Sequence, residues 1–256
     1  MPRLETLRIY PVKGLDGVTE DAAAVLGGGT LAGDREFALF DADGEVINGK
    51  RTDRVHDLQT DYDRASRSLT VETPAGETAT FALDEEPERA ADWFGDFFGE
   101  DLTVRRDTSL GFVDRREMGP SVISTATLET VASWFDEMTV AGARRRLRAN
   151  VEISGVPAFW EDRFVGEDAP AFAVGGVRFE GVTPCGRCVV PRRDPDTGEP
   201  IPEFRETFLE KRAETFPEWA DEDAFEHLYT VMIITRVPQS HRDETLRVGD
   251  DVSVLN

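Results

Sequence analysis

Two cysteines carry the most reactive side chains of the chain, in the sequence Cys-Gly-Arg-Cys at residues 185–188. A structural zinc site needs four ligands, and neither a second cysteine pair nor metal-like histidine spacing accompanies this one. A thioredoxin-type redox pair lies at the start of a helix, whereas Val-Val-Pro follows Cys188. These features favour a single working thiolate, which ligates a soft metal or acts as a nucleophile beside Arg187. The alternative is two small buried apolar residues.

Positive charge gathers in two stretches that contain no acid, although the chain has 51 Asp and Glu against 29 Lys and Arg, a net charge of −22. Residues 141–150 include four arginines, and residues 181–193 include three arginines and both cysteines. Such clusters suit a small anionic ligand. The alternative, that the arginines are ion-pair partners for the acidic surface, is equally compatible with the sequence.

Two further cations lie next to predicted strands. Lys13, one of only three lysines, follows the first predicted strand and precedes Gly14, which lets a ligand approach the backbone. Arg35 follows Asp34 just before another predicted strand. Both are interpreted as anion contacts, with a solvent-facing lysine and an Asp34–Arg35 ion pair as the alternatives. The Asp-Pro-Asp-Thr-Gly turn at 194–198 is expected to shape a wall of the site.

The composition is that of a folded protein, with 256 residues of which 39% are hydrophobic. No apolar run approaches the roughly 18–20 residues that span a bilayer, and the N-terminus lacks a secretory apolar core. We therefore expect a cytoplasmic protein without a membrane partner. The negative charge argues against nucleic acid binding. Because acid is spread along the whole chain, a solvated coat suited to a halophilic, high-salt cytoplasm is favoured over a surface for a cationic partner.

The elements that must position these residues are mostly short strands with helices between them. Alternating apolar residues predict strands at 4–10, 36–41, 45–47, 58–62, 68–72, 78–83, 102–105, 121–124, 150–154, 172–174, 177–179, 189–190, 229–235, 246–248 and 252–255. Helical spacing is found at 88–98, 125–138, 204–208 and 220–226. The pattern predicts a β-rich, mixed α+β protein with two domains, residues 1–115 and 116–256.

Six motifs occur in an order that resembles one known family. They are Tyr-Pro-Val-Lys-Gly at 10–14, Gly-Asp-Arg at 33–35, Arg-Ala-Asn at 148–150 with Ile-Ser-Gly at 153–155, Cys-Gly-Arg-Cys at 185–188, Asp-Pro-Asp-Thr-Gly at 194–198 and Val-Gly-Asp-Asp-Val at 248–252. Nearly the whole chain resembles MOSC proteins with an associated N-terminal domain, a group that includes amidoxime-reducing components and the C-terminal domain of molybdenum-cofactor sulfurases. This resemblance implies an N-terminal β-barrel-like domain followed by a MOSC β-barrel domain with a few helices.

The resemblance also implies a molybdenum cofactor, a pterin with a metal-binding dithiolene and a phosphate tail; the same ligands suit tungsten. Cys188 matches the cysteine that completes the metal's coordination, and it is the implied catalytic residue. The implied cofactor contacts are Lys13, Arg35, Lys50, Ser124, Thr125, Arg148, Asn150 and Arg187. The chain departs from the family pattern at Ala149, where a proline is usual, and at Gly186, where the reductase branch often has serine.

Three functions follow as hypotheses. The first is a molybdenum-dependent oxidoreductase that reduces N-hydroxylated or N-oxide compounds as small-molecule substrates. Its electrons would come from a separate electron-transfer protein, because the sequence contains no heme or flavin motif. The second is a sulfur carrier or transferase, in which Cys188 receives a persulfide from a cysteine desulfurase for metallocofactor sulfuration and Cys185 resolves it. The third is a binding module with no chemistry at its cysteines.

Overall fold

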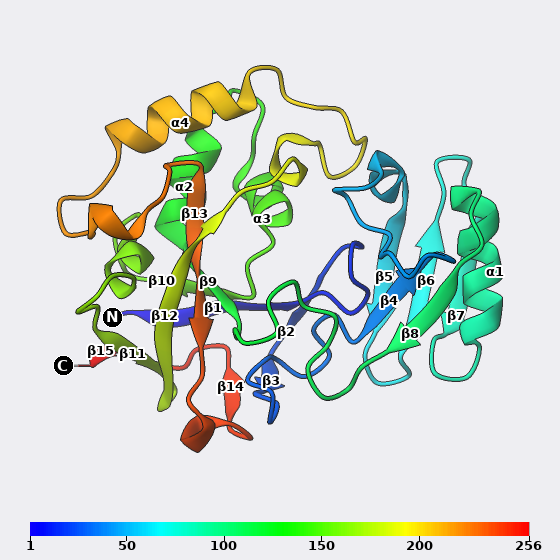
Figure 1. Cartoon of the computed structure of the whole chain (residues 1–256), viewed down its shortest axis with the longest axis horizontal. Coiled ribbons are helices and arrows are strands. Elements are labelled where there is room, and N and C mark those ends of the chain that lie inside the picture. The colour runs from blue at the N-terminus through cyan, green and yellow to red at the C-terminus, as the bar shows by residue number, and fades with distance from the viewer. Residues whose placement is uncertain (256) are drawn as a thin grey trace.

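The computed structural model describes residues 1–255 and confirms a β-rich, mixed fold with few helices (Figure 1). The strands are β1 (Arg3–Ile9), β2 (Val18–Glu20), β3 (Ala22–Ala24), β4 (Phe37–Phe40), β5 (Gln59–Asp63), β6 (Ser68–Glu72), β7 (Thr78–Ala82), β8 (Thr103–Arg106), β9 (Ser121–Ser124), β10 (Val151–Ser154), β11 (Ala171–Val174), β12 (Val177–Gly186), β13 (Thr230–Arg236), β14 (Thr245–Arg247) and β15 (Val252–Leu255). The α-helices are α1 (Pro87–Phe98), α2 (Thr125–Ser133), α3 (Val140–Leu147) and α4 (Phe204–Glu214). Single 3-10 turns form η1 (Asp53–Asp57), η2 (Trp160–Phe164), η3 (Val190–Arg192), η4 (Glu222–Ala224) and η5 (Gln239–His241).

The largest sheet has eight strands in the order β15-β11-β12-β13-β9-β10-β1-β2. This sheet curls round so that the start of β1 meets the start of β15. Backbone hydrogen bonds join them, from Leu4 N to Asp250 O at 2.9 Å and from Val252 N to Pro2 O at 3.0 Å. The strands from β15 to β1 therefore surround one apolar core. Because β1 is a full member of this sheet, the first strand of the chain packs with the second half of the sequence. The division of the chain into two domains, residues 1–115 and 116–256, remains a prediction.

A smaller lobe contains β4 to β8 and is flanked by α1 (right-hand side of Figure 1). β4 pairs with β8, and β5, β6 and β7 form an antiparallel meander. Helix α1 starts at Pro87 and buries Phe94 and Phe98 in the core of this lobe. Val12 and Leu15, from the loop after β1, are buried in the same core. Their burial fixes the loop that carries Lys13 at the boundary between the two lobes.

The sequence predicted one helix over residues 125–138, whereas the structure has the shorter α2 there and a separate, unpredicted helix, α3, after it. That prediction is wrong at its C-terminal end, because α2 stops at Ser133 and α3 begins anew after Thr139. The Thr139 side chain caps α3 by accepting a hydrogen bond from Gly142 N at 3.0 Å. The basic stretch at 141–150 is therefore mostly helical.

Three short predictions were also wrong. The strand expected at 189–190 is absent, because Pro191 has no N–H for a ladder and lies in the turn η3. Residues 45–47 make only an isolated bridge between Phe40 and Val46, and residues 220–226 contain the single turn η4 rather than a helix. Over residues 1–255, no helix is long and apolar enough to cross a membrane.

Candidate functional site

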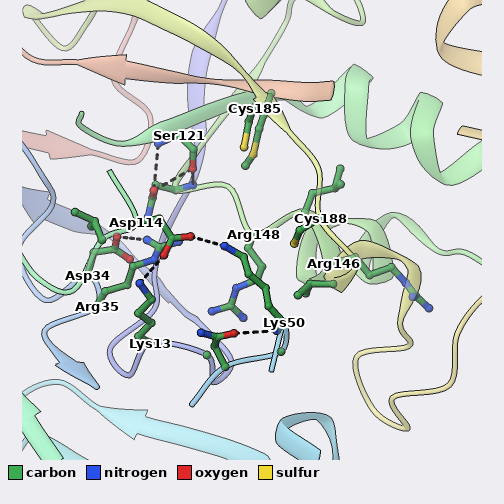
Figure 2. A pocket seen from close by; sticks show the side chains of 18 of the residues that line it. Lys13, Asp34, Arg35, Lys50, Asp114, Ser121, Arg146, Arg148, Cys185 and Cys188 are labelled. Atoms are coloured by element: carbon green, nitrogen blue, oxygen red, sulfur yellow. Dashed lines mark hydrogen bonds and ion pairs between the residues drawn. The ribbon is translucent and has the colours of Figure 1, made fainter. Parts of the chain in front are cut away.

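A cavity of about 380 Å³ lies where the loops of the smaller lobe meet α3 and the ends of β9 and β12 (Figure 2). Nine Lys and Arg side chains line it, against three Asp side chains. The cations are Lys13, Arg35, Lys50, Arg115, Arg145, Arg146, Arg148, Arg187 and Arg193, and the acids are Asp16, Asp34 and Asp114. In a chain with a net charge of −22, this local excess of positive charge favours an anionic ligand.

Both cysteines of the Cys-Gly-Arg-Cys sequence line the cavity as free, half-buried thiols. β12 ends at Gly186, so Cys188 lies in the extended link between that strand and η3. Arg187 is held by two contacts: its Nη1 donates to Cys185 Sγ at 3.2 Å and its Nη2 to Leu147 O at 3.0 Å. Arg187 therefore bridges the cysteine loop to the end of α3, while Cys188 keeps a sulfur at the cavity wall (Figure 2).

Lys13 and Lys50 converge on the carboxylate of Asp114 (Figure 2). Lys13 Nζ lies 2.5 Å from Asp114 Oδ1, and Lys50 Nζ lies 2.9 Å from Oδ2. Burial would raise the pKa of Asp114, but hydrogen bonds and charge from both lysines hold that pKa well below its usual range. Burial lowers the pKa of Lys50, and the bond and charge of Asp114 outweigh it and raise that pKa. This corner is therefore built to hold anionic oxygens.

Tyr10 lies between two guanidinium groups. Cζ of Arg35 is 5.0 Å and Cζ of Arg148 is 4.1 Å from the centre of the Tyr10 ring. Arg35 is also paired with the buried Asp34, whose Oδ1 accepts a hydrogen bond from Tyr10 N at 2.9 Å. Burial and the charge of Arg35 lower the pKa of Arg148 from its usual value, while its Nη2 donates to Leu15 O at 2.7 Å. The predicted Asp34–Arg35 ion pair and the cavity position of Arg35 are thus both present.

Arg148 enters the cavity because it ends α3 in the left-handed conformation, with a φ of 59°. Asn150 follows it as a buried connector. Its Oδ1 accepts from Ser121 Oγ at 3.0 Å, and its Nδ2 donates to Arg8 O at 3.1 Å. Asn150 therefore lines the cavity with its side chain already engaged, and it fixes the backbone that carries Arg148.

The other arginines of α3 point to different partners. Arg144 faces away from the cavity and binds Glu152 with Nε at 2.6 Å and Nη2 at 2.9 Å. Arg145 pairs with Asp16 and Asp196, each at 2.7 Å, and the buried Arg146 pairs with Asp194 at 2.9 Å. Arg145 and Arg146 thereby attach the turn at 194–198 to α3, so this turn does form part of the cavity wall, through Pro195.

Ser124 and Thr125 are not brought to the cavity. Ser124 caps α2 by accepting from Thr127 N at 3.1 Å, and Thr125 Oγ1 donates to Glu152 Oε1 at 2.9 Å. Lys13, Arg35, Lys50, Arg148, Asn150, Arg187 and Cys188, by contrast, all line the cavity as predicted neighbours.

Asp114 and His56 are among the cavity residues that sequence reasoning missed. Asp114 carried no signal, because one acid among 51 is indistinguishable before the two lysines are seen around it. His56 is one of three histidines, but it has no metal-like spacing to the other two, and only the fold brings it to the cavity.

Several buried nitrogens of the cavity residues have no hydrogen-bond partner among the described residues 1–255. They are His56 Nε2, Arg146 Nε, Arg187 Nε and Arg193 Nε. Unpartnered buried donors are costly, and an anionic ligand with several acceptor atoms would satisfy them. Within the same residues, no group of three or more His, Cys, Asp and Glu side chains could hold a metal ion. The unpartnered nitrogens and the cation-rich lining fit an anionic organic ligand.

Comparison of the sequence with protein families and curated proteins shows which proteins this chain is similar to. The MOSC N-terminal beta barrel domain family matches residues 1–93, and the MOSC domain family matches residues 117–253. Among curated proteins, mitochondrial amidoxime reducing component 2 of Bos taurus is 25% identical over 228 residues, covering 75% of this chain and 66% of the relative. The Macaca fascicularis protein of the same name is 24% identical, covering 75% and 67%. The match thus spans about two thirds of each relative's length. This chain belongs to the MOSC domain family and has the N-terminal beta barrel domain associated with it.

Proposed function

We propose that this chain binds a molybdenum or tungsten cofactor in the cavity, with the Cys188 thiolate as a ligand of the metal, and reduces N-hydroxylated or N-oxide compounds. The observation that carries the proposal is the position of Cys188 on the wall of a cavity lined by nine cations in a strongly acidic chain. Membership of a family associated with molybdenum-cofactor binding, and distant relatives named as amidoxime reducing components, support the choice of cofactor and reaction.

The cavity residues have different proposed roles toward the parts of the cofactor. Lys13, Lys50 and Arg35 hold the phosphate end, since the first two already place ammonium groups around a pair of carboxylate oxygens. Arg148 lies between this corner and the cysteine loop, and it would contact the pterin. Cys188 completes the metal site, and Arg187 fixes the loop that carries it. Asn150 acts indirectly, by holding the backbone next to Arg148.

The reaction removes oxygen from substrate nitrogen. The N–O bond breaks, two electrons and two protons are consumed, and the amine-type product and water leave. The bound cofactor supplies the two-electron chemistry of this step. The chain's own part is to exclude bulk water with the turn at 194–198, to neutralise the anionic cofactor with the cavity cations, and to hold the thiolate. The electrons are supplied by a separate electron-transfer protein.

The first test is the metal content of matched cysteine variants, produced in a host that makes the cofactor. Wild type and Cys185→Ala should contain near-stoichiometric molybdenum or tungsten, because Cys185 is engaged by Arg187 rather than placed as ligand. Cys188→Ala should lose the metal or change its absorption spectrum. Absence of both metals from wild type, in a host that loads another molybdenum enzyme, would refute the proposal.

A second candidate, the sulfur carrier, is favoured by one observation: both cysteines are free, half-buried and on the same cavity. In this function a cysteine desulfurase transfers a sulfur atom to Cys188, and the resulting persulfide passes it to a metallocofactor, with Cys185 resolving the intermediate. Mass spectrometry of wild type after incubation with a desulfurase and cysteine would show one added sulfur on Cys188. Reductase turnover without any persulfide would exclude this candidate.

A further inference from the structure

His56 occupies a position in the cavity that the proposed cofactor contacts leave unassigned. It lies in η1 of the smaller lobe, next to Val55, which is buried in that lobe's core. Thr52 caps the turn by accepting from Arg54 N at 3.2 Å. The turn is therefore anchored at Thr52 and Val55, and it places His56 in the lining of the cavity.

Two glycines leave room around the imidazole on the side of the cysteine loop. A Cβ on Gly49 would lie 3.4 Å from His56 Nε2 and 3.2 Å from Cγ2 of Val190. A Cβ on Gly198 would lie 3.6 Å from Cβ of His56. His56 thus sits between the turn at 194–198 and Val190, two residues beyond Cys188. It therefore lies beside the loop that carries Cys188, which forms the thiolate end of the cavity.

The Nε2 atom of His56 is buried and has no hydrogen-bond partner within residues 1–255. Leaving a buried polar atom unsatisfied is unfavourable, so a fold pairs the atom or leaves it for a ligand. Arg187 Nε and Arg193 Nε, from the loop on the same side, are also buried and unpartnered. Three buried nitrogens of residues that line the cavity are therefore left for a ligand to satisfy.

The surroundings of His56 favour its neutral form. Burial, followed by the charges of Arg148 and Arg193, lowers the pKa of His56 from its ordinary value of 6.5. Asp16 acts in the opposite direction and Arg145 in the same direction, and neither reverses the shift. A neutral imidazole offers an N–H or a lone pair at Nε2, which suits an N–OH group that both donates and accepts.

We propose that His56 is a substrate-binding residue, whose Nε2 forms a hydrogen bond with the N–O group of the small-molecule substrate at the thiolate end of the cavity. This inference rests on the proposed reductase function and deepens it, because it identifies which side chain recognises the group that is reduced. It also assigns the smaller lobe a direct role in substrate selection: the MOSC domain provides the thiolate, and η1 provides the imidazole from the facing side.

The test combines nuclear magnetic resonance with kinetics on the metal-loaded protein. With only three histidines in the chain, the imidazole nitrogens of His56, His227 and His241 can be resolved individually after histidine labelling. Benzamidoxime is added without an electron donor, so that it binds but is not turned over. The Nε2 signal of His56 should shift with saturation, while that of His241, which is not among the residues that line the cavity, should not.

Kinetics then use a graded pair of variants. His56→Leu removes the hydrogen bond and should raise the KM for benzamidoxime about tenfold with little change in kcat, the expected value for one lost hydrogen bond of about 1.4 kcal/mol. His56→Gln keeps a polar nitrogen and should recover most of that loss. His241→Gln is the matched control and should equal wild type. Thermal unfolding verifies that each variant is folded.

The possible outcomes distinguish a failure of the proposed role of His56 from a failure of the proposed reductase function. If wild type reduces benzamidoxime but the His56 signal stays fixed and His56→Leu keeps a wild-type KM, the role of His56 is refuted and the reductase function stands. If wild type contains metal and does not reduce N-hydroxylated compounds, the reductase function fails. A shift of the His56 signal together with an elevated KM in His56→Leu alone supports both.

Discussion

Single residues around the cavity show two different uses of charge. Lys13, Lys50 and Arg35 are paired with acids at the cavity surface, so an anionic ligand competes with Asp114 and Asp34 for them. The nitrogens near the thiolate end are buried without partners instead. The first arrangement keeps the empty protein stable, whereas the second is satisfied only when a ligand is present.

Another buried cluster, outside the cavity, makes stability depend on pH. Glu161 and Asp162 lie side by side in η2, both almost fully buried, and Asp162 pairs with the fully buried Arg212. Burial, with the charge of Asp162 adding to it, raises the pKa of Glu161 well above its ordinary value of 4.5. Between the ordinary pKa of 4.5 and the raised pKa, the folded state keeps a proton that the unfolded state has released. The free energy of unfolding therefore falls as pH rises through this range.

We predict that Glu161→Gln removes this pH dependence. The variant has no proton to lose, so its stability relative to wild type should increase between pH 5 and pH 8, by about 1 kcal/mol or more. Urea unfolding of both proteins at several pH values measures the difference and cancels the contributions of other acids. A difference that is constant over this range would show that Glu161 ionises normally in the folded state.

Among the elements, α3 determines where the basic stretch points. Residues 144 and 148 would share one face of a continuous helix. The helix ends between them in the left-handed turn at Arg148, which directs that side chain to Tyr10 and into the cavity, while Arg144 stays on the outer face with Glu152. The C-terminus of α3 is thus the element that separates a ligand contact from a structural ion pair.

Substitutions at Arg148 should separate stability from ligand binding. Arg148→Gly suits the positive φ, whereas Arg148→Ala retains the steric cost of that conformation, so the glycine variant should be the more stable by about 1 kcal/mol. Both variants lack the guanidinium and should retain much less molybdenum or tungsten than wild type. Chemical denaturation and metal analysis test the two effects separately. Equal stability of the variants would contradict the first, and full metal content the second.

At the scale of the whole molecule, a net charge of −22 leaves the surface with strong self-repulsion, because the ion pairs engage only part of the acid. Screening changes sharply with salt, since the Debye length falls from about 10 Å at 0.1 M to about 3 Å at 1 M. The acidic coat is therefore tolerated best in concentrated salt.

We predict that the midpoint of thermal unfolding rises as KCl is increased from about 0.1 M to about 1 M, as repulsion between exposed acids is screened. Glu206 and Glu210 are exposed on α4, and the double variant Glu206→Gln/Glu210→Gln should show a smaller rise than wild type. Differential scanning calorimetry at matched protein concentrations measures both slopes. A midpoint that falls with KCl, or that is unaffected, would show that attractive ion pairs dominate.

Much of this protein was determined by local sequence. The β-rich character, most strands and α1 follow from alternation and helical spacing, since those patterns depend on neighbouring residues only. Residue types alone also singled out residues 185–188 and the arginine-rich stretches, and the structure brings residues of both to one cavity. The early end of α2 at Ser133 and the separate helix α3, which begins after its capping residue Thr139, were missed.

The composition of the site, in contrast, was decided by tertiary structure. Asp114 gains its role only when Lys13 and Lys50 approach it from loops 101 and 64 residues away in the chain. Ser124 ends cavity strand β9 and Thr125 begins α2, yet the Ser124 hydroxyl caps α2 and the Thr125 hydroxyl binds Glu152. His56 reaches the thiolate end because the smaller lobe packs against the loop after β12. Long-range packing fixes these distances, and no local pattern encodes them, because they depend on closing the large sheet and placing a second lobe beside it.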